Sequence, residues 1–340
     1  MPGIIFPAEW YPQSAVQVTW PHTETDWADD LEEVTACYIG FSREILKRQK
    51  LLVVCAHARE IGKYFSRDER KNLICAEIES NDTWARDHGG ISLFIDDRPA
   101  ISDFGFNGWG LKFAANRDNL ITGRLFEKSV FQPGVAYRNN LHFILEGGSI
   151  ESDGKGTLLT TSQCLLAPNR NQPMTQDEID DYLKQCLGAE RVLWLHHGYL
   201  AGDDTDSHID TLARFCDEQT IAYVKCDDPQ DEHYQELRMM EEELESFVAH
   251  DGQPYRLVGL PMADAVYHDG ERLPATYANF LIINGAVLIP FYGTEKDHIA
   301  KDQLREIFPD REIIGVDCGP LIRQHGSLHC ATMQFPIGFL

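Results

Sequence analysis

The sequence has few basic residues and no long hydrophobic run. Its 340 residues include 30 Lys and Arg against 54 Asp and Glu, which gives a formal net charge of −24. Nucleic acids and anionic membranes bind clustered Lys and Arg, so this charge argues against both kinds of partner. The longest apolar stretch, 280–292, is interrupted by Asn284, Gly285 and Pro290 and is too short to span a bilayer. We expect a soluble protein without a nucleic-acid or membrane partner.

Paired cysteines and a secretory leader are also missing. Nine cysteines are scattered from Cys37 to Cys330 without a Cys-x-x-Cys pair. This usage indicates reduced thiols rather than a disulfide framework or a zinc knuckle. Residues 1–10 contain neither a basic start nor a sustained apolar segment, so they do not resemble a signal peptide. Both features predict a cytoplasmic protein.

Several familiar catalytic motifs are absent. The chain contains no Gly-x-Ser-x-Gly of a serine hydrolase, no Gly-x-x-x-x-Gly-Lys of a phosphate-binding loop and no His-Glu-x-x-His of a metalloprotease. Zinc-ligand residue types do occur, and Cys330, His208, Asp210 and His329 are the candidates. Their spacing matches no metal motif, so a zinc site is an alternative and not the first hypothesis.

Strand-like and helix-like segments alternate along the whole chain. Helical spacing of apolar residues predicts helices over 31–50, 177–186 and 228–247 and one last helix near 299–307. Apolar runs predict strands at 15–19, 51–56, 73–78, 91–95, 143–145, 192–195, 221–225, 255–260, 280–290, 312–316 and 331–335, with 157–166 as a long strand or strand pair. Residues 104–119 are expected to form a loop. Because no Pro-, Gly- or Ser-rich linker divides the chain, we predict a single α/β domain over 1–340.

One polar stretch stands out, Gly-Asp-Asp-Thr-Asp-Ser-His-Ile-Asp-Thr at 202–211. It places four carboxylates around one imidazole. If the chain is extended here, His208 and Asp210 point to the same face, because side chains alternate along a strand. A proton-transfer group would then lie beside a fixed negative charge.

Three further stretches supply partners for this pair: Trp-Ala-Arg-Asp at 84–87, Glu-Gly-Gly-Ser at 146–149 and His-Cys at 329–330. Cys330 is the candidate nucleophile, since a thiol reacts as a thiolate when a cation or imidazole lowers its pKa. On an extended segment His329 would point away from Cys330, which makes His208 the better base. Taken singly, Cys330 is more simply a buried structural thiol, Asp87 a surface ion pair with Arg86, and Glu146 a turn residue.

As an ordered set, these four stretches resemble the agmatine deiminase and bacterial-type peptidylarginine deiminase family. The similarity runs from Pro-Ala-Glu-Trp at 7–10 to Cys330 and includes 106–110, 164–166, 169–171 and 277–280. The resemblance implies a pseudo-fivefold α/β propeller (pentein) of ββαβ-type units with the site at its centre. It also implies a reaction that needs no metal and no organic cofactor.

The resemblance further implies a role for each site residue. Cys330 is the nucleophile, His208 the general acid and base, and Glu146 the carboxylate that orients His208. Asp87 and Asp210 bind the guanidinium, which presents its N–H groups as a planar fork that suits carboxylates. Substrate-binding roles fall in addition to Asp204, which matches the residue that faces the distal amine of agmatine, and to Trp84 and Trp109.

The expected substrate is a small cationic guanidino compound, with agmatine first and N-carbamoylputrescine as its product. The nucleophile loop 324–329 replaces the Gly-Gly-Gly-Asn segment that is usual in agmatine deiminases. Peptidylarginine deiminases normally carry a signal peptide and an additional C-terminal domain, and this chain ends ten residues after Cys330. Peptidyl arginine therefore stays an alternative substrate, a non-catalytic guanidino- or polyamine-binding protein is an alternative function, and a homo-oligomer is left open.

Overall fold

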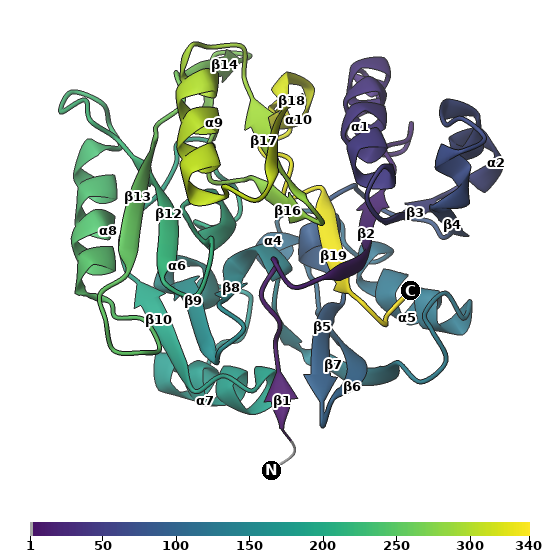
Figure 1. The fold of residues 1–340 in the computed structure, drawn as a ribbon, viewed down its shortest axis with the longest axis horizontal. Helices are drawn as coiled ribbons and strands as arrows, with labels where there is room; N and C mark the ends of the chain where they lie inside the picture. The colour runs from purple at the N-terminus through teal and green to yellow at the C-terminus, as the bar shows by residue number, and fades with distance from the viewer. Residues whose placement is uncertain (1–2) are drawn as a thin grey trace.

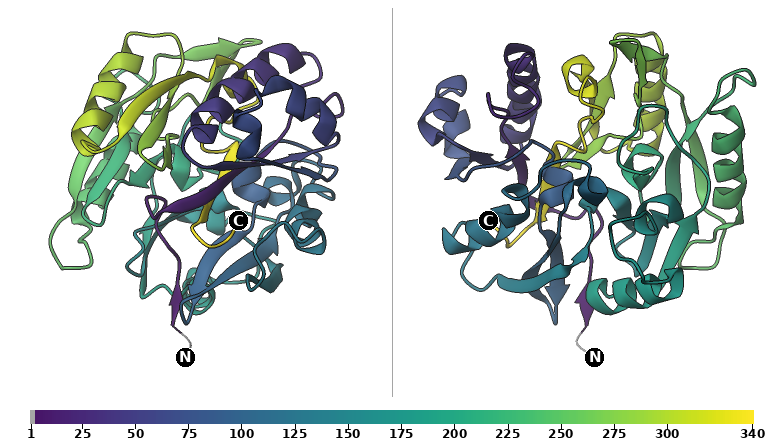
Figure 2. Two further views of the ribbon diagram at one scale, coloured as in Figure 1. Left: turned by 45° about the vertical axis from the view of Figure 1, so that its right-hand side comes forward. Right: turned by 180° about the vertical axis from the view of Figure 1, so that it is seen from behind.

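A computed structural model of the chain describes residues 3–340, so Met1 and Pro2, which belong to the predicted domain and to the N-terminal segment 1–10, lie outside the described residues. The fold is mixed α/β (Figures 1 and 2). Its main strands form these sheets: β19 (Thr332–Pro336), β2 (Gln13–Thr19), β3 (Lys50–Cys55) and β4 (Leu73–Glu77); β1 (Ile4–Ile5), β5 (Ile91–Ile95), β6 (Arg98–Gly105) and β7 (Ala136–Ile144); β8 (Ile150–Ser152), β9 (Thr157–Thr161) and β10 (Arg191–Leu195); β11 (Ala213–Phe215), β12 (Thr220–Lys225) and β13 (Arg256–Pro261); β16 (Leu281–Ile283), β17 (Ala286–Phe291) and β18 (Glu312–Asp317). A separate hairpin joins β14 (Val266–His268) to β15 (Glu271–Leu273).

All of these main sheets repeat one pattern. An antiparallel pair of strands is followed by a helix and by a third strand that runs parallel to the second. A parallel neighbour needs a crossover connection, and a helix supplies it. The crossover helices are α1 (Leu31–Leu46), α5 (Ile121–Glu127), α7 (Gln176–Leu187), α8 (Tyr234–Ser246) and α9 (Lys296–Ile307). Figure 1 places α1, α8 and α9 towards the periphery, with α4 and β19 nearer the middle.

Short helices fill the connections. They are α2 (Ala58–Ile61), α3 (Ala85–His88), α4 (Gly108–Leu111), α6 (Ser162–Leu165) and α10 (Gly319–Ile322), with 3₁₀ turns η1 (Gly62–Tyr64), η2 (Glu69–Lys71), η3 (Asp118–Leu120), η4 (Gly147–Ser149) and η5 (Ile209–Thr211). Of these, α3, η4 and η5 carry or adjoin residues that the sequence marked for chemistry.

Local sequence signals explain where α7 begins and ends. The Thr175 hydroxyl accepts from the Glu178 amide, and the Glu178 carboxylate accepts from the Thr175 amide, which together form a capping box. Gly188 ends the helix with φ 73°, a left-handed conformation that glycine adopts without steric cost. Helix α7 thus confirms the helix predicted over 177–186.

Apolar side chains from each sheet and its helix form the core. Phe41 and Ile45 of α1, for example, are fully buried in the same cluster as Val16 and Val18 of β2. This packing confirms the predicted strand 15–19 and the helix that follows it. Within residues 3–340, no helix is long and apolar enough to cross a membrane.

Four sequence-based expectations about secondary structure were wrong. The second half of 157–166 is helix α6, because Thr161 accepts a hydrogen bond from the Cys164 amide and caps a turn. The expected loop 104–119 contains α4 and η3, and helix α8 begins at Tyr234 rather than at 228. Residues 209–211 form the 3₁₀ turn η5 rather than an extended strand. At α6 and η5 a local side-chain or turn preference interrupts the expected strand.

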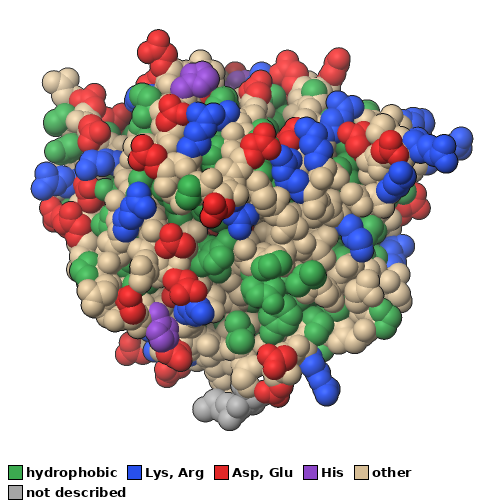
Figure 3. Space-filling view, viewed as in Figure 1, with side chains coloured by type: hydrophobic (Ala, Val, Ile, Leu, Met, Phe, Trp, Pro, Cys, Tyr) green, Lys and Arg blue, Asp and Glu red, His purple; other side chains and the backbone are tan. Residues whose placement is uncertain are grey.

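The surface carries charges of both signs. On the face in Figure 3, Asp and Glu side chains are interspersed with Lys and Arg, and a group of hydrophobic side chains lies below the centre. The excess of acidic residues is therefore spread over this face instead of forming one strongly charged patch.

Two glycines with open space around them provide a test of the backbone. A Cβ added at Gly40, in α1, or at Gly285, in the β16–β17 turn, would meet no atom within 4 Å, but Gly285 has φ +71°. We expect Gly40→Ala to stabilise the fold by about 1 kcal/mol, since alanine has the higher helix propensity. Gly285→Ala should destabilise it by about 1–2 kcal/mol, because a Cβ is unfavourable in the left-handed conformation. Denaturant unfolding of both variants measures the difference, and equal effects of the same sign would contradict this account.

Candidate active site

The sequence-predicted catalytic residues converge, although they come from separate places in the chain. Asp87 lies in α3, Glu146 directly precedes η4, His208 directly precedes η5, Asp210 lies within η5, and Cys330 precedes β19. All are buried, with exposed fractions between 0% for Asp210 and 7% for Cys330. Burial strengthens electrostatic interactions, because little water is present to screen them.

Gly148 marks the point at which three of these side chains meet. A Cβ added to Gly148 would lie 2.7 Å from Asp87 Oδ1, 2.7 Å from His208 Nδ1 and 3.2 Å from Asp210 Oδ2. Only a residue without a side chain leaves this space free. The predicted convergence of His208 and Asp210 is correct, although the 3₁₀ turn and not an extended strand produces it.

Asp87 is fixed by two donors. The Gly148 amide donates to Oδ1 at 3.0 Å, and the Trp109 indole N–H donates to Oδ2 at 3.0 Å. Burial raises the pKa of Asp87 to about 6, although the nearby His208 ring, 3.6 Å away, opposes the shift. Trp109 has φ 54°, so an uncommon left-handed backbone places its ring here. In the described structure its N–H therefore orients Asp87.

Asp210 has one bonded and one free oxygen. Its Oδ2 accepts from His329 Nδ1 at 2.7 Å, while Oδ1 has no hydrogen-bond partner within residues 3–340. Burial alone would raise the pKa of Asp210, but the hydrogen bond and charge of His329 outweigh it and hold this pKa below the usual value. Asp210 is thus a buried anion with one oxygen available to a ligand.

The Cys330 thiol lies beside this anion. Its Sγ is 3.9 Å from Asp210 Oδ2 and receives a hydrogen bond from Asn279 Nδ2 at 3.3 Å. Burial, together with the charges of Asp210 and Asp87, raises the pKa of Cys330 well above that of a free thiol. Without a ligand, Cys330 is therefore a neutral thiol, and a bound cation would favour its thiolate.

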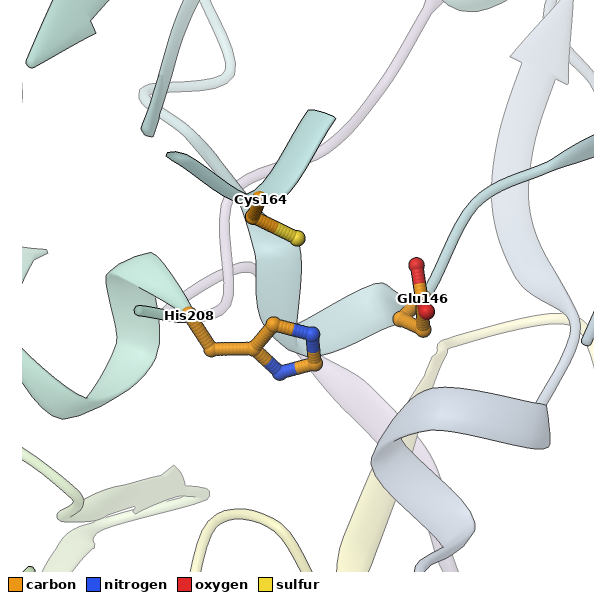
Figure 4. A group of neighbouring side chains, drawn as sticks. All are labelled: Glu146, Cys164 and His208. Carbon is orange, nitrogen blue, oxygen red and sulfur yellow. The ribbon is translucent and has the colours of Figure 1, made fainter. Parts of the chain in front are cut away.

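His208 faces two environments. Its Nδ1 is directed towards Asp87, while its Nε2 has no hydrogen-bond partner among the described residues. The sulfur of Cys164 and the carboxylate of Glu146 also lie near the ring (Figure 4). The Cys164 sulfur, one Glu146 carboxylate oxygen and one His208 ring nitrogen are all within 4.8 Å of one another. Burial would lower the pKa of His208, but Asp87, Cys164 and Glu146 raise it well above its ordinary value. These neighbours therefore favour the charged form of the ring.

Glu146 is held by an arginine that sequence analysis quoted without assigning it a role. Arg170 Nε donates to Glu146 Oε1 at 2.9 Å, and both side chains are fully buried. The same guanidinium binds Asp206 at 2.6 Å and the Thr205 carbonyl at 2.8 Å. Arg170 thus fixes both Glu146 and the acidic loop that carries His208. Its position within Asn-Arg-Asn at 169–171 was the available signal.

Two other residues expected to bind the substrate lie in different surroundings. Asp204 is half-buried, and burial together with the adjacent Asp203 raises the pKa of its carboxyl to about 6. Trp84 is buried against Trp27, with ring centroids 5.7 Å apart, and a Cβ at Gly326 would lie 2.2 Å from the Trp84 ring. Trp84 therefore supports the nucleophile loop through Gly326, which allows close contact because it lacks a side chain.

The zinc alternative does not fit the observed hydrogen bonds. Both ring nitrogens of His329 face carboxylate oxygens, so neither is available to a metal. Glu146, Cys164 and His208 form a second cluster of side chains that could bind a metal. In this cluster the Glu146 carboxylate is already paired with the Arg170 cation. A further cation at either place would displace an existing ion pair or hydrogen bond.

Solved structures share this architecture. A Porphyromonas gingivalis protein, provisionally named an arginine deiminase, is 57% identical and superposes with a TM-score of 0.96 over 99% of both chains. A C. jejuni agmatine deiminase, solved as a cysteine-to-serine variant with substrate bound, is 39% identical, with a TM-score of 0.91 over 98% of this chain and 96% of that one. Fold and site together define a mixed α/β protein of the guanidine-modifying class.

The sequence comparisons identify the family. The family model described as Porphyromonas-type peptidyl-arginine deiminase matches residues 5–336, and the chain belongs to this family. Agmatine deiminase from Pseudomonas aeruginosa is 31% identical over 98% of this chain and 96% of its own length. The resemblance inferred from the ordered motifs is thereby confirmed.

The raised pKa of Asp87 predicts a pH-dependent effect on stability. The unfolded pKa is near 3.9, so the carboxyl is neutral in both states only well below pH 3.9, whereas above pH 6 the folded state holds a buried anion. Asp87→Asn should therefore gain up to about 3 kcal/mol relative to wild type at pH 7.5, and this gain should shrink to about 1 kcal/mol at pH 4.5. Urea unfolding at pH 4.5 and 7.5 measures the change. A stability difference that is equal at both pH values would contradict the raised pKa.

Proposed function

We propose that this protein is a hydrolase that converts agmatine and water into N-carbamoylputrescine and ammonia. The observation that carries the proposal is the buried meeting of two carboxylates, Asp87 and Asp210, with the thiol of Cys330 and the imidazole of His208. A guanidinium is planar, permanently charged and rich in N–H donors, so paired carboxylates in a dry site bind it well. The free Oδ1 of Asp210 is an acceptor for one of these donors.

Substrate binding activates the nucleophile in this scheme. The same negative charges that raise the pKa of Cys330 attract the guanidinium, and the bound cation then stabilises the thiolate, so the thiol loses its proton to solvent as the substrate binds. The thiolate adds to the guanidinium carbon, and one C–N π pair moves onto nitrogen. The charged His208 gives its proton to the departing nitrogen, the C–N bond breaks, and ammonia leaves. A covalent amidino-thioether on Cys330 remains.

A water molecule completes the turnover. The now neutral His208 removes a proton from water, the oxygen adds to the amidino carbon, and the C–S bond breaks as the electron pair returns to sulfur. The ureido product forms, and the proton that the guanidinium brought leaves on ammonia as ammonium. Glu146 stabilises the charged form of His208 and orients the ring. Its carboxylate is held by Arg170 and lies within 4.8 Å of a His208 ring nitrogen.

Agmatine is favoured over peptidyl arginine by burial and by the acidic loop. The reacting atoms are more than nine-tenths buried, which suits a slender alkyl guanidine better than a folded polypeptide. Asp204 lies four residues before His208 and offers a carboxylate to the distal ammonium group. The relatives named agmatine deiminase, one of them with substrate bound, support the same choice.

The remaining parts of the hypothesis concern arrangement and context. We propose that the repeated sheets are arranged with pseudo-fivefold symmetry as a propeller around the site, which the common strand pattern supports. We also propose a cytoplasmic location, since the nine cysteines form no disulfide. The reaction would serve putrescine biosynthesis, because removal of the carbamoyl group from the product gives putrescine.

Rapid acid quench followed by intact-protein mass spectrometry tests the covalent step. With excess agmatine, wild type should show a transient adduct of amidino mass together with ammonia release, and Cys330→Ser should show neither while still binding agmatine. Cys186→Ser, at a buried cysteine outside the site, should retain the adduct. Turnover of peptidyl arginine alone would overturn the substrate assignment, and binding without turnover of any guanidino compound would favour the binding protein.

Gly148→Ala tests the geometry around the guanidinium. The new Cβ would occupy the space between Asp87, His208 and Asp210, so it should lower kcat/KM for agmatine by about two orders of magnitude, the scale of a 1 Å misplacement. Gly40→Ala is the matched control, because its Cβ meets no atom within 4 Å. Unchanged activity of Gly148→Ala, in a protein of native stability, would contradict the proposed binding mode.

A further inference from the structure

His329 directly precedes the nucleophile but points away from it. Its ring lies between two carboxylates, with Nδ1 2.7 Å from Asp210 Oδ2 and Nε2 2.6 Å from Glu9 Oε2. All three side chains are at least nine-tenths buried. The hydrogen bond from the Thr332 amide to the His329 carbonyl closes a turn, so this segment is not the extended strand that the sequence suggested. Sequence analysis gave neither His329 nor Glu9 a catalytic or positioning role.

The two hydrogen bonds fix the protonation state of the ring. A carboxylate oxygen accepts hydrogen bonds and donates none, whereas a neutral imidazole has only one N–H. If His329 were neutral, one bare nitrogen would face an oxygen lone pair at close distance in a buried site. With Glu9 and Asp210 both ionised, both nitrogens must donate, and the ring is then an imidazolium. With both nitrogens engaged, His329 has no lone pair with which to act as a base for Cys330.

Glu9 is itself immobilised as an anion. Arg214 Nη2 donates to Glu9 Oε2 at 2.8 Å, and the Ile282 amide donates to Oε1 at 2.7 Å. Burial alone would raise the pKa of Glu9, but His329 and Arg214 outweigh it and hold this pKa far below its ordinary range. Arg214 is fully buried and is bound in turn by Glu151 and by the carbonyls of Ala278 and Phe280.

The buried charges therefore alternate in sign along a line that ends in the site. Arg214 is positive, Glu9 negative, His329 positive and Asp210 negative, and the proposed guanidinium would be the next positive group. At Asp210 the contacts are asymmetric, because His329 occupies Oδ2 and leaves Oδ1 without a partner among residues 3–340. This asymmetry gives the carboxylate a defined orientation before any ligand arrives.

We propose that Glu9 and His329 form a positioning pair that keeps Asp210 ionised and turns its free Oδ1 towards the substrate guanidinium. The proposal rests on the proposed function for the identity of the substrate. It assigns Glu9, more than 300 residues from Cys330 in the sequence, to the site. Without the imidazolium, Asp210 would lie beside Asp87 and Cys330 with Arg214, His208 and Arg86 as its remaining cationic neighbours, and its carboxyl would become protonated more readily.

The test uses agmatine binding to a Cys330→Ser protein, in which the chemistry is switched off. In that background we compare Glu9→Gln, which removes the charge but keeps the shape, with Asp103→Asn. Asp103 is a buried carboxylate that accepts from the Tyr137 hydroxyl outside the site, so it controls for the loss of a buried charge. Calorimetry from pH 5.5 to 9 gives the affinity of each protein.

With Glu9→Gln, we expect agmatine affinity to fall at least tenfold at pH 7 and to reach its plateau at a higher pH than in the parent. The reason is that an uncharged glutamine in place of Glu9 weakens the His329 cation, so Asp210 ionises later. Asp103→Asn should follow the parental curve. A Glu9→Gln curve that coincides with the parental curve overturns the positioning role. If the Cys330→Ser parent binds no agmatine, the proposed function fails first, and the two failures are thereby distinguishable.

A second measurement does not depend on substrate. In protein labelled with ¹⁵N-histidine, the His329 ring, assigned by its loss in His329→Gln, should show two protonated nitrogens at pH 8, and Glu9→Gln should reduce it to one. A neutral His329 ring in the parent at pH 8 would overturn the proposal even if Glu9→Gln were to bind agmatine weakly.

Discussion

The structure depends on keeping two carboxylates and a thiol together where water is scarce. A buried anion is costly unless a cation or a set of donors compensates it. Asp210 is compensated by His329, which Glu9 and Arg214 hold in place, whereas Asp87 receives only two neutral donors and the His208 ring. The site therefore keeps uncompensated negative charge and favours a cationic ligand, because a guanidinium would neutralise that charge.

Two buried arginines, Arg214 and Arg170, hold the carboxylates around the site in place. Arg214 fixes Glu9 and Glu151, and Arg170 fixes Glu146 and the loop around Thr205. Both arginines have fully buried side chains and bind several acceptors at once, for which the forked guanidinium is well suited. The side chains of the candidate site can therefore be placed by short turns, since the buried ion pairs hold these turns in one conformation.

The repeated strand pattern explains how distant segments meet. Connections between the strands carry the site residues: α3 follows β4, η4 follows β7, η5 precedes β11, and the Cys330 turn precedes β19. Tight backbone conformations then aim the side chains, such as the left-handed φ of 54° at Trp109 and of 67° and 62° at Asp206 and Ser207. These are uncommon for residues other than glycine and are sustained here by surrounding contacts.

The sequence by itself determined the alternation of strands and helices, since hydrophobic periodicity and the caps of helices such as α7 are local properties. It also determined the family, because Asp87, Glu146, His208, Asp210 and Cys330 occur in ordered motifs that resemble it, and the family model that matches residues 5–336 confirms the membership. Only the tertiary structure decided which charges face one another. Glu9, Cys164 and Arg170 lie in the family-like segments 7–10, 164–166 and 169–171, but nothing local shows which groups they face, and the 3₁₀ turn at Ile209 replaced an expected strand. Such pairings join residues far apart in the sequence, and Glu9 and His329 are separated by more than 300 residues. Local propensity contains no information about such contacts.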